Sequence, residues 1–268
     1  MRIEGKVIAD GLLQQIQGTS TALAIVSSGD DSASATYINT LKKLGNKLNI
    51  EVRHVVIPSD FDTQQFKEYI YDLNEDETVG SILVMYPLPS KYCREDIADA
   101  VAPEKDIDCQ GALRLGMGYR GGDMPCTSSA CLLMLLHSDI ELEGKKVVVV
   151  GRSNVVGKPL VELLQRFNAT VTLCHTKTKD LKNELLTADV VISATGHTHL
   201  ITSDMVREDA IIVDAGISFK DGKICGDVDP DVYNKVAAYT PVPGGVGVVS
   251  NAVVFFKHYA WEAMCSKC

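Results

Sequence analysis

Short apolar segments rich in β-branched residues alternate with amphipathic segments along nearly the whole chain, and this alternation restricts the fold more than any other feature. The first predicted strands cover 22–28, 51–58 and 81–87, and the first predicted helices cover 34–48, 62–73 and 94–101. Parallel strands need long crossover connections, which are usually helical. The order therefore predicts an α/β fold with a parallel sheet covered on both faces.

The pattern is interrupted once and then starts again. The stretch 103–127 is rich in glycine and is expected to be a loop, serving as a hinge or as the wall of a site. Beyond it the sequence predicts helices at 127–137, 159–167, 180–187 and 251–264 and strands at 145–150, 169–175, 188–196 and 209–217. This second series has the order of a nucleotide-binding α/β domain. A chain of 268 residues can hold one large domain or two smaller ones.

A glycine turn, GRSNVVGKP, follows the apolar run KKVVVV and precedes a predicted helix. Gly151 permits a tight turn, and Gly157 permits close packing of the helix on the strand. Backbone amides at the helix N-terminus can then approach a pyrophosphate. The spacing differs from the usual G-x-G-x-x-G, so a structural turn without a ligand remains the alternative.

The end of the following strand bears on which dinucleotide such a turn would bind. NAD sites usually place an acidic residue there, whereas NADP sites place basic groups. Here the strand ends in CHTKT, and the first acid is Asp180. Arg152, His175 and Lys177 could together neutralise a 2′-phosphate. These charges favour NADP over NAD.

The net charge and the apolar pattern argue against several classes of partner. A formal net charge of −9 and a pI near 5.2 make nucleic acid an unexpected partner. Apolar stretches are too short for a membrane helix, so no membrane partner is expected. The first residues lack the apolar core of a signal peptide. We expect a cytoplasmic protein, with an organellar protein that has lost its presequence as the alternative.

The eight cysteines are scattered along the chain, and we expect reduced thiols. Cys265 and Cys268 form a single C-x-x-C pair at the end of the chain, and a zinc site usually needs four ligands. His197 and His199 form an H-x-H in a polar loop, which is a weak indication of metal binding. The sequence therefore predicts no metal site.

Several motifs together resemble one family. They are PEKDID (103–108), GRSNVVGKP (151–159), CHTKT (174–178), GDVD (226–229) and TPVPGGVG (240–247), with looser matches at S-x-x-Y (34–37) and LVMYPLP (83–89). In this order they resemble the FolD-like family of methylenetetrahydrofolate dehydrogenase/methenyltetrahydrofolate cyclohydrolases. The resemblance covers essentially the whole chain.

This resemblance implies two domains around a cleft. The folate domain would comprise 1–126 and 250–268, and a Rossmann-like NADP domain would comprise 127–249. The substrate would be a tetrahydrofolate derivative. Two copies of the chain would associate through the NADP domain as a homodimer.

The resemblance also implies roles for particular residues. Tyr37 would stack on the folate and Asp108 would hydrogen-bond its pterin ring, so both would serve the reaction directly. The substrate site would comprise Tyr37, Met85, Asp108, Pro243, Gly244 and Gly245, with Pro241 to Gly247 forming a loop near the nicotinamide. The coenzyme site would comprise Gly151, Arg152, Ser153, Val156, Gly157, His175, Thr176, Thr195, Gly196, Gly216 and Ile217.

The chain departs from the family pattern on the inferred folate side. Leu41 stands where the family usually has lysine, Met85 where it has glutamine and Cys109 where it has glycine, and Val248–Ser250 replace Pro-Met-Thr. Oxidising the methylene bridge requires positioning of substrate and coenzyme but no protein acid or base. Hydrolysis of the methenyl product requires a titratable group, for which the family resemblance implies the lysine with its glutamine partner.

We therefore expect an NADP-dependent methylenetetrahydrofolate dehydrogenase with weak or absent cyclohydrolase activity. Lys42 is a poor substitute for the lysine, because one step along a helix turns a side chain by about 100°. Three alternatives remain open. They are a bifunctional dehydrogenase/cyclohydrolase, a non-catalytic protein that binds folate or NADP, and a Rossmann oxidoreductase with a non-folate substrate.

Overall fold

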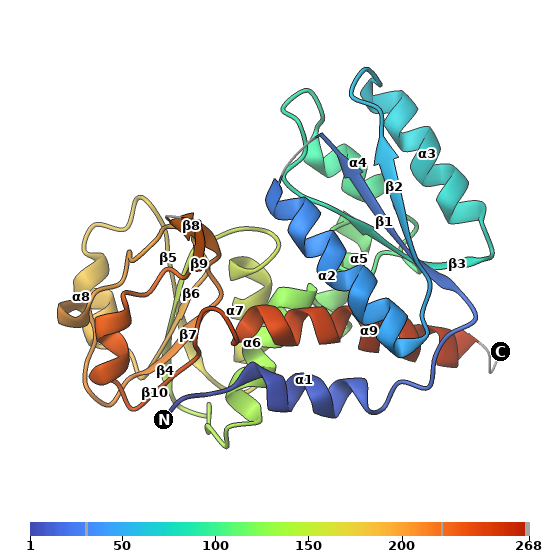
Figure 1. Ribbon diagram of the computed structural model, residues 1–268. Coiled ribbons are helices and arrows are strands. Elements are labelled where there is room, and N and C mark those ends of the chain that lie inside the picture. The colour runs from blue at the N-terminus through green and yellow to red at the C-terminus, as the bar shows by residue number, and fades with distance from the viewer. Residues whose placement is uncertain (30–31, 221, 266–268) are drawn as a thin grey trace. The chain divides into compact units, whose positions relative to one another are not determined.

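The computed structural model describes residues 1–29, 32–220 and 222–265 (Figure 1). The chain forms two compact units, each assembled from separate stretches of sequence. The large-sheet unit comprises Met1–Gly11 and Met124–Val253, and the small-sheet unit comprises Leu12–Asp123 and Val254–Cys268. This division differs from the expected one chiefly at the first eleven residues, which belong with the large sheet.

The large-sheet unit is built on a parallel sheet with the strand order β10-β7-β6-β4-β5. Its strands are β4 (Lys146–Val150), β5 (Thr170–Cys174), β6 (Val190–Ser193), β7 (Ile211–Asp214) and β10 (Ala238–Tyr239). The connecting helices are α6 (Cys126–Leu136), α7 (Gly157–Gln165), α8 (Leu181–Leu186), η1 (Ser203–Met205) and η2 (Pro230–Asn234), and an antiparallel hairpin joins β8 (Ser218–Lys220) to β9 (Lys223–Cys225).

The centre of this sheet is buried on both faces. Val148 and Val150 of β4 pack with Leu185 of α8 and Ile212 of β7 in one core cluster. Side chains alternate between faces along a strand, so Val147 and Val149 point to the opposite face. There α7 packs against β4, β5 and α6. The continuous valine run is therefore explained by a central strand with helices on both sides.

Residues 1–3 extend the edge of the same sheet. Arg2 forms a parallel bridge to Tyr239, and the Ile3 amide donates to the Tyr239 carbonyl at 2.8 Å. Helix α1 (Gly5–Leu13) follows, and the Gly5 amide donates to the carbonyl of Gly244 at 2.9 Å. The beginning of the described chain is thus held by a segment near its other end.

The small-sheet unit contains a parallel sheet with the order β2-β1-β3. Its strands are β1 (Ala22–Ser28), β2 (Val52–Ile57) and β3 (Val79–Val84), and its helices are α2 (Ser32–Leu48), α3 (Thr63–Glu75), α4 (Arg94–Ala100) and α5 (Ala112–Gly118). Helix α9 (Val246–Cys265) begins in the large-sheet unit and contributes its second half to this one.

Helix α3 shows how local sequence sets an element in this unit. Asp62 accepts from the Gln65 amide, and the Gln65 side chain accepts from the Asp62 amide, both at 2.9 Å. This capping box satisfies two amides that have no partner within the helix. Phe66 and Ile70 of α3 then pack in one core cluster with Ala24 and Val26 of β1.

Three expectations from the sequence need correction. The glycine-rich stretch 103–127 contains a regular helix, α5, in which the Leu115 amide donates to the Gly111 carbonyl at 2.9 Å. The last helix begins at Val246 rather than at 251, so Val246 and Gly247 are helical and not part of the preceding loop. Helix α7 likewise begins at Gly157, before Pro159, which still lies in its first turn.

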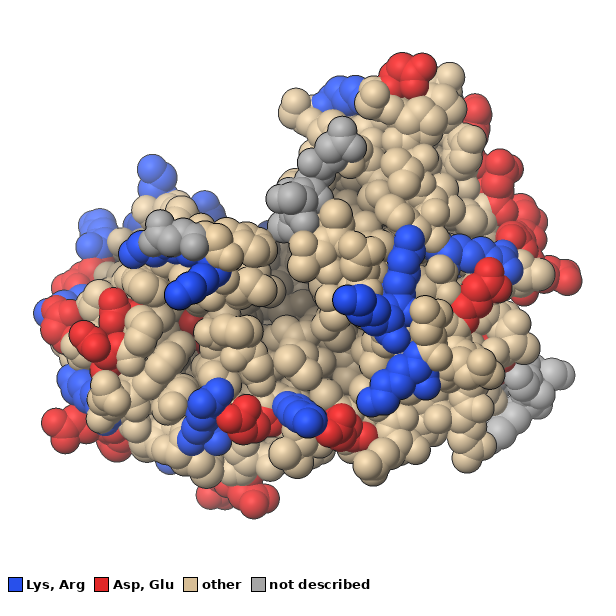
Figure 2. Space-filling view, viewed as in Figure 1, with Lys and Arg blue, Asp and Glu red and all other residues tan. Residues whose placement is uncertain are grey.

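Charged side chains of both signs lie on the face shown in Figure 2. Ion pairs include Lys182 with Asp204 at 2.6 Å and Arg53 with Glu51 at 2.7 Å. Exposed pairs of this kind contribute little to stability. Within the described ranges, no helix has the length and apolar character needed to cross a membrane.

Candidate functional site

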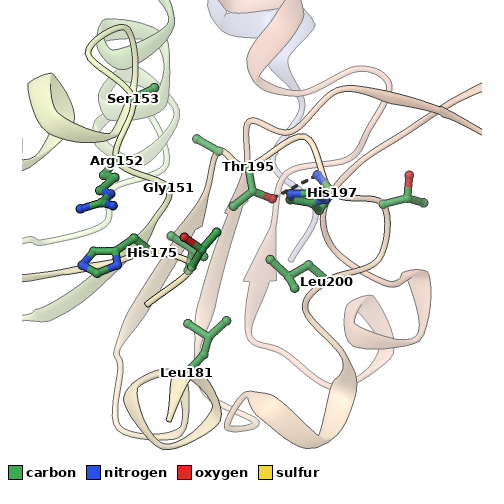
Figure 3. A pocket seen from close by; sticks show the side chains of 12 residues that line it. Gly151, Arg152, Ser153, His175, Leu181, Thr195, His197 and Leu200 are labelled. Carbon is green, nitrogen blue, oxygen red and sulfur yellow. Dashed lines mark hydrogen bonds between the residues drawn. The ribbon is translucent and has the colours of Figure 1, made fainter. Parts of the chain in front are cut away.

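A cavity of about 600 Å³ lies where β4, β5 and β6 end in the large-sheet unit (Figure 3). The chain runs from β4 to β5 on one side and then crosses back to β6 on the other side of β4. The strand order therefore reverses at β4. Open α/β sheets bind ligands at such a switch point, outside the carboxyl ends of the strands. Gly151 follows β4, His175 follows β5 and Thr195 follows β6, and all three line the cavity.

The turn from β4 into α7 leaves no space for a side chain at its glycines. Gly151 has φ of 111°, and a Cβ there would lie 2.4 Å from the Ala194 carbonyl oxygen. A Cβ on Gly157 would lie 1.8 Å from the Gly151 carbonyl oxygen. The turn can fold this tightly because both side chains are absent.

Hydrogen bonds fix the rest of this turn. The Val156 amide donates to Ser153 Oγ at 3.1 Å, and the Lys158 amide donates to the Ser153 carbonyl at 3.1 Å. From α6, the buried Ser128 hydroxyl contacts the carbonyls of Val155 and Val156 at 3.0 and 3.1 Å. The start of α7 is therefore held in place before any ligand arrives.

The end of β5 carries the groups expected to distinguish the two dinucleotides. His175 at this strand end and Arg152 from the glycine turn line the cavity (Figure 3). Thr176 is also part of the lining. Asp180, the first acid after the strand, caps α8 by accepting from the Asn183 amide at 3.0 Å. Because its carboxylate is engaged as a helix cap, the groups that face the cavity at this strand end are basic or neutral.

Two buried carboxylates support the opposite wall. Asp227 Oδ2 accepts from Ser193 Oγ at 2.7 Å and from the Thr195 amide and hydroxyl at 2.7 and 2.8 Å. Asp214 accepts from the amides of Gly216, Asp227 and Val228, and burial raises its pKa to about 7. A Cβ on Gly216 would lie 2.0 Å from Asp227 Oδ1. Asp227 positions Thr195, Asp214 holds the backbone amide of Asp227, and neither carboxylate lines the cavity.

The structure brings together only part of the expected coenzyme set. Among the described residues, the cavity lining includes Gly151, Arg152, Ser153, His175, Thr176 and Thr195. Val156 and Gly157 belong to the same turn without lining the cavity, and Gly196, Gly216 and Ile217 are also outside the lining. The sequence reasoning missed Leu181, His197 and Leu200, which do line it. The His197 amide donates to Thr195 Oγ1 at 3.1 Å.

Tyr37, Met85 and Asp108, the expected folate residues, lie in the small-sheet unit. Tyr37 is half-buried on α2, whereas Leu41, one turn later, is completely buried. Met85 follows β3 and lines a second cavity, of about 280 Å³. Among the described residues, Tyr37 and Asp108 are not part of that lining. Pro243, Gly244 and Gly245 form a loop before α9 in the large-sheet unit.

A chain of polar contacts holds Asp108. The Gln110 side-chain amide donates to Asp108 Oδ2 at 2.7 Å, and Arg94 donates to the Gln110 side-chain oxygen at 2.7 Å. The Arg94 guanidinium also lies 4.1 Å from the centre of the Tyr86 ring. Nothing in the sequence motif pointed to Arg94 or Gln110, because their positions follow from how α4 and the next loop pack.

Cys109 occupies a backbone conformation that suits glycine. Its φ is 52°, in the left-handed region, which costs a residue with a Cβ about 1 kcal/mol. This explains in physical terms why the related motif usually has glycine after the aspartate. The Cys109 side chain is buried, and burial raises the pKa of its thiol to about 11.

The cysteines described in the structure are unpaired thiols at positions 93, 109, 126, 131, 174 and 225. Cys268 lies outside the described residues, and the side chain of Cys265 is not described either. In the part of the chain that is described, three or more His, Cys, Asp or Glu side chains are nowhere grouped so as to hold a metal ion.

The large-sheet unit thus defines a dinucleotide-binding domain of Rossmann type, joined to a second α/β unit. The family models describe both parts. Residues 125–264 match the NAD(P)-binding domain, and residues 3–108 the catalytic domain, of tetrahydrofolate dehydrogenase/cyclohydrolase. The chain belongs to the tetrahydrofolate dehydrogenase/cyclohydrolase family.

Individual relatives agree over nearly the full length. "Bifunctional protein FolD" of Methanosphaerula palustris is 41% identical over 263 residues, covering 95% of this chain and 94% of the relative. The crystal structure of the bifunctional FolD dehydrogenase/cyclohydrolase from Campylobacter jejuni is 33% identical, with a TM-score of 0.94 and 99% of each chain covered. The Trypanosoma brucei enzyme, solved with NADP and an inhibitor, is 28% identical, with a TM-score of 0.91, covering 100% of this chain and 99% of that one.

Proposed function

We propose that this chain oxidises 5,10-methylenetetrahydrofolate to 5,10-methenyltetrahydrofolate with NADP and then hydrolyses the product to formyltetrahydrofolate. The observation that carries the proposal is the preformed cavity at the ends of β4, β5 and β6 in a chain of this family. Relatives across the full length are named as bifunctional. They favour the bifunctional alternative over the loss of cyclohydrolase expected from Leu41 and Met85.

The coenzyme cavity fits a dinucleotide because its wall includes Gly151, in a glycine turn too tight for a Cβ at Gly151 or Gly157, and this turn leads into the N-terminus of α7. Bound NADP would supply an acceptor for the hydride that leaves the methylene carbon. Gly151, Ser153 and the start of α7 would hold the phosphates. Arg152 and His175 would face the 2′-phosphate, which supports NADP over NAD because Asp180 is committed to capping α8.

On the folate side, Tyr37 would stack on the substrate and Asp108 would hydrogen-bond the pterin ring. The contribution of the protein to the oxidation is positioning, since the substrate nitrogen stabilises the cation that forms. The loop of Pro243, Gly244 and Gly245 would border the substrate. Two copies would form a homodimer through the large-sheet unit, a proposal that sedimentation equilibrium tests directly.

A paired assay on one preparation tests the function. NADPH formation from methylenetetrahydrofolate and hydrolysis of added methenyltetrahydrofolate are followed separately by absorbance. We expect both activities, with NADP giving the higher kcat/KM than NAD. NADPH formation without enzymatic hydrolysis would support a dehydrogenase that lacks cyclohydrolase activity. Coenzyme binding without either reaction would indicate a binding protein.

Replacing Gln110 by leucine is expected to raise the KM for methylenetetrahydrofolate about tenfold with kcat changed less than twofold. The substitution removes the donor that holds Asp108 Oδ2, and a hydrogen bond to a charged group is worth about 1.5 kcal/mol or more. The control is Gln64→Leu, the same substitution at an exposed position of α3. A Gln110 variant with the parent KM would show that Asp108 does not need this support.

A further inference from the structure

The second cavity, in the small-sheet unit, is lined in part by polar side chains that the coenzyme chemistry does not use. It lies beside the carboxyl ends of β1 and β3, and its walls include Ser27, Ser28, Ser34, His54 and Met85. Among the described residues that line it, His54 alone has a side chain that can gain or lose a proton near neutral pH. The cavity therefore combines a proton acceptor with several hydroxyl groups.

His54 is already hydrogen-bonded within this wall. It lies on β2, paired in register with Ile25 of β1, and its Nε2 is 2.9 Å from the Oγ of Ser27. Burial, assisted by the charge of Lys42, lowers the pKa of His54, so the neutral imidazole predominates at pH 7. A neutral imidazole has one nitrogen able to accept a proton, and the Ser27 hydroxyl can carry a proton to it.

We propose that His54 and Ser27 form the proton-transfer pair for methenyltetrahydrofolate hydrolysis in this chain, acting on a water molecule in the second cavity. This inference rests on the proposed function. The pair takes the place of the lysine and glutamine that the family resemblance implies at positions 41 and 85. Leu41 is fully buried and apolar, so it offers no proton acceptor.

The proton balance of the reaction is complete without a further reagent. The water oxygen forms a bond to the methenyl carbon while one of its protons passes through the Ser27 hydroxyl to His54. The imidazolium then returns this proton to the ring nitrogen as the bond from that nitrogen to carbon breaks. The hydroxyl proton leaves as the formyl group forms, and it is released to solvent through the same pair.

The test compares the two reactions in each variant, using methenyltetrahydrofolate and methylenetetrahydrofolate as the probes. General acid–base catalysis is worth roughly a hundredfold or more. His54→Gln is therefore expected to lower the ratio of hydrolysis to NADPH formation about a hundredfold, and Ser27→Ala about tenfold. Added imidazole should restore part of the hydrolysis in His54→Ala. The control is His137→Gln, an exposed histidine at the end of α6.

Different outcomes test the bifunctional activity and the role of His54 and Ser27 separately. A parent chain that forms NADPH but hydrolyses nothing overturns the bifunctional proposal, and the role of His54 with it. A parent chain that hydrolyses methenyltetrahydrofolate, with variants of His54 and Ser27 keeping the ratio within twofold, overturns the inference alone. If His54→Gln does not fold, Ser27→Ala, which changes little volume, decides the matter by the same ratio.

Discussion

Gly157→Ala is expected to abolish measurable NADP binding and to lower the thermal unfolding temperature. The added Cβ would lie 1.8 Å from the carbonyl oxygen of Gly151, and that oxygen belongs to the backbone. The turn from β4 into α7 must therefore open, which moves the amides of the helix N-terminus away from the phosphates. We expect a loss of stability of about 3 kcal/mol. Isothermal titration with NADP and a thermal scan measure the two effects.

The matched control is Gly11→Ala, in α1 of the same unit. Nothing lies within 4 Å of a Cβ built at Gly11. Exchanging glycine for alanine inside a helix usually stabilises it by about 0.5–1 kcal/mol. Equal affinity for NADP in the two variants would show that the turn does not approach the coenzyme.

Leu41→Lys is expected to destabilise the small-sheet unit without raising hydrolysis. Leu41 is 0% exposed, and a buried ammonium group without a partner costs about 3 kcal/mol or loses its proton. Met85, at the position where the family resemblance implies glutamine, is itself buried, and its thioether is only a weak acceptor. The measurements are the thermal unfolding temperature and the ratio of hydrolysis to NADPH formation.

Two further variants separate charge from shape at this position. Leu41→Met keeps the volume and should cost less than about 1.5 kcal/mol. Adding Met85→Gln to Leu41→Lys should recover part of the lost stability, because the amide can accept from the ammonium group. A single Leu41→Lys variant with parental stability and tenfold faster hydrolysis would contradict the view that both positions must change together.

The parts of the fold that could be predicted depend on local sequence. The valine run of β4 and the glycines that follow it predict a central parallel strand and a tight turn into a helix, and both are present. Helix α5 could not be predicted, because its glycines disfavour a helix. Packing supports it instead, since Arg114 pairs with Asp123 at 2.9 Å and lies 4.9 Å from the Trp261 ring centre.

The site residues that could be predicted also depend on local sequence. Gly151, Arg152 and His175 belong to contiguous motifs, and they line the cavity at the ends of β4, β5 and β6. Asp227 lies in a recognisable motif, but its support of Thr195 depends on the register between distant segments. His54 lies in an ordinary strand pattern. Its contact with Ser27 depends on the pairing of β1 with β2, which no motif records.

The bonding of residues 1–3 to β10 has a consequence for biosynthesis. Ile3 and its partner Tyr239 lie at opposite ends of the sequence, with the whole of 12–123 translated between the two parts of the large-sheet unit. At 5–20 residues per second, a ribosome needs roughly 10–50 s to reach that partner. The second half of α9, which completes the small-sheet unit, is made later still. The large-sheet unit cannot complete its edge before Tyr239 is made, and the small-sheet unit waits for α9, so nascent chains would depend on protection of both incomplete sheets until these segments have been translated.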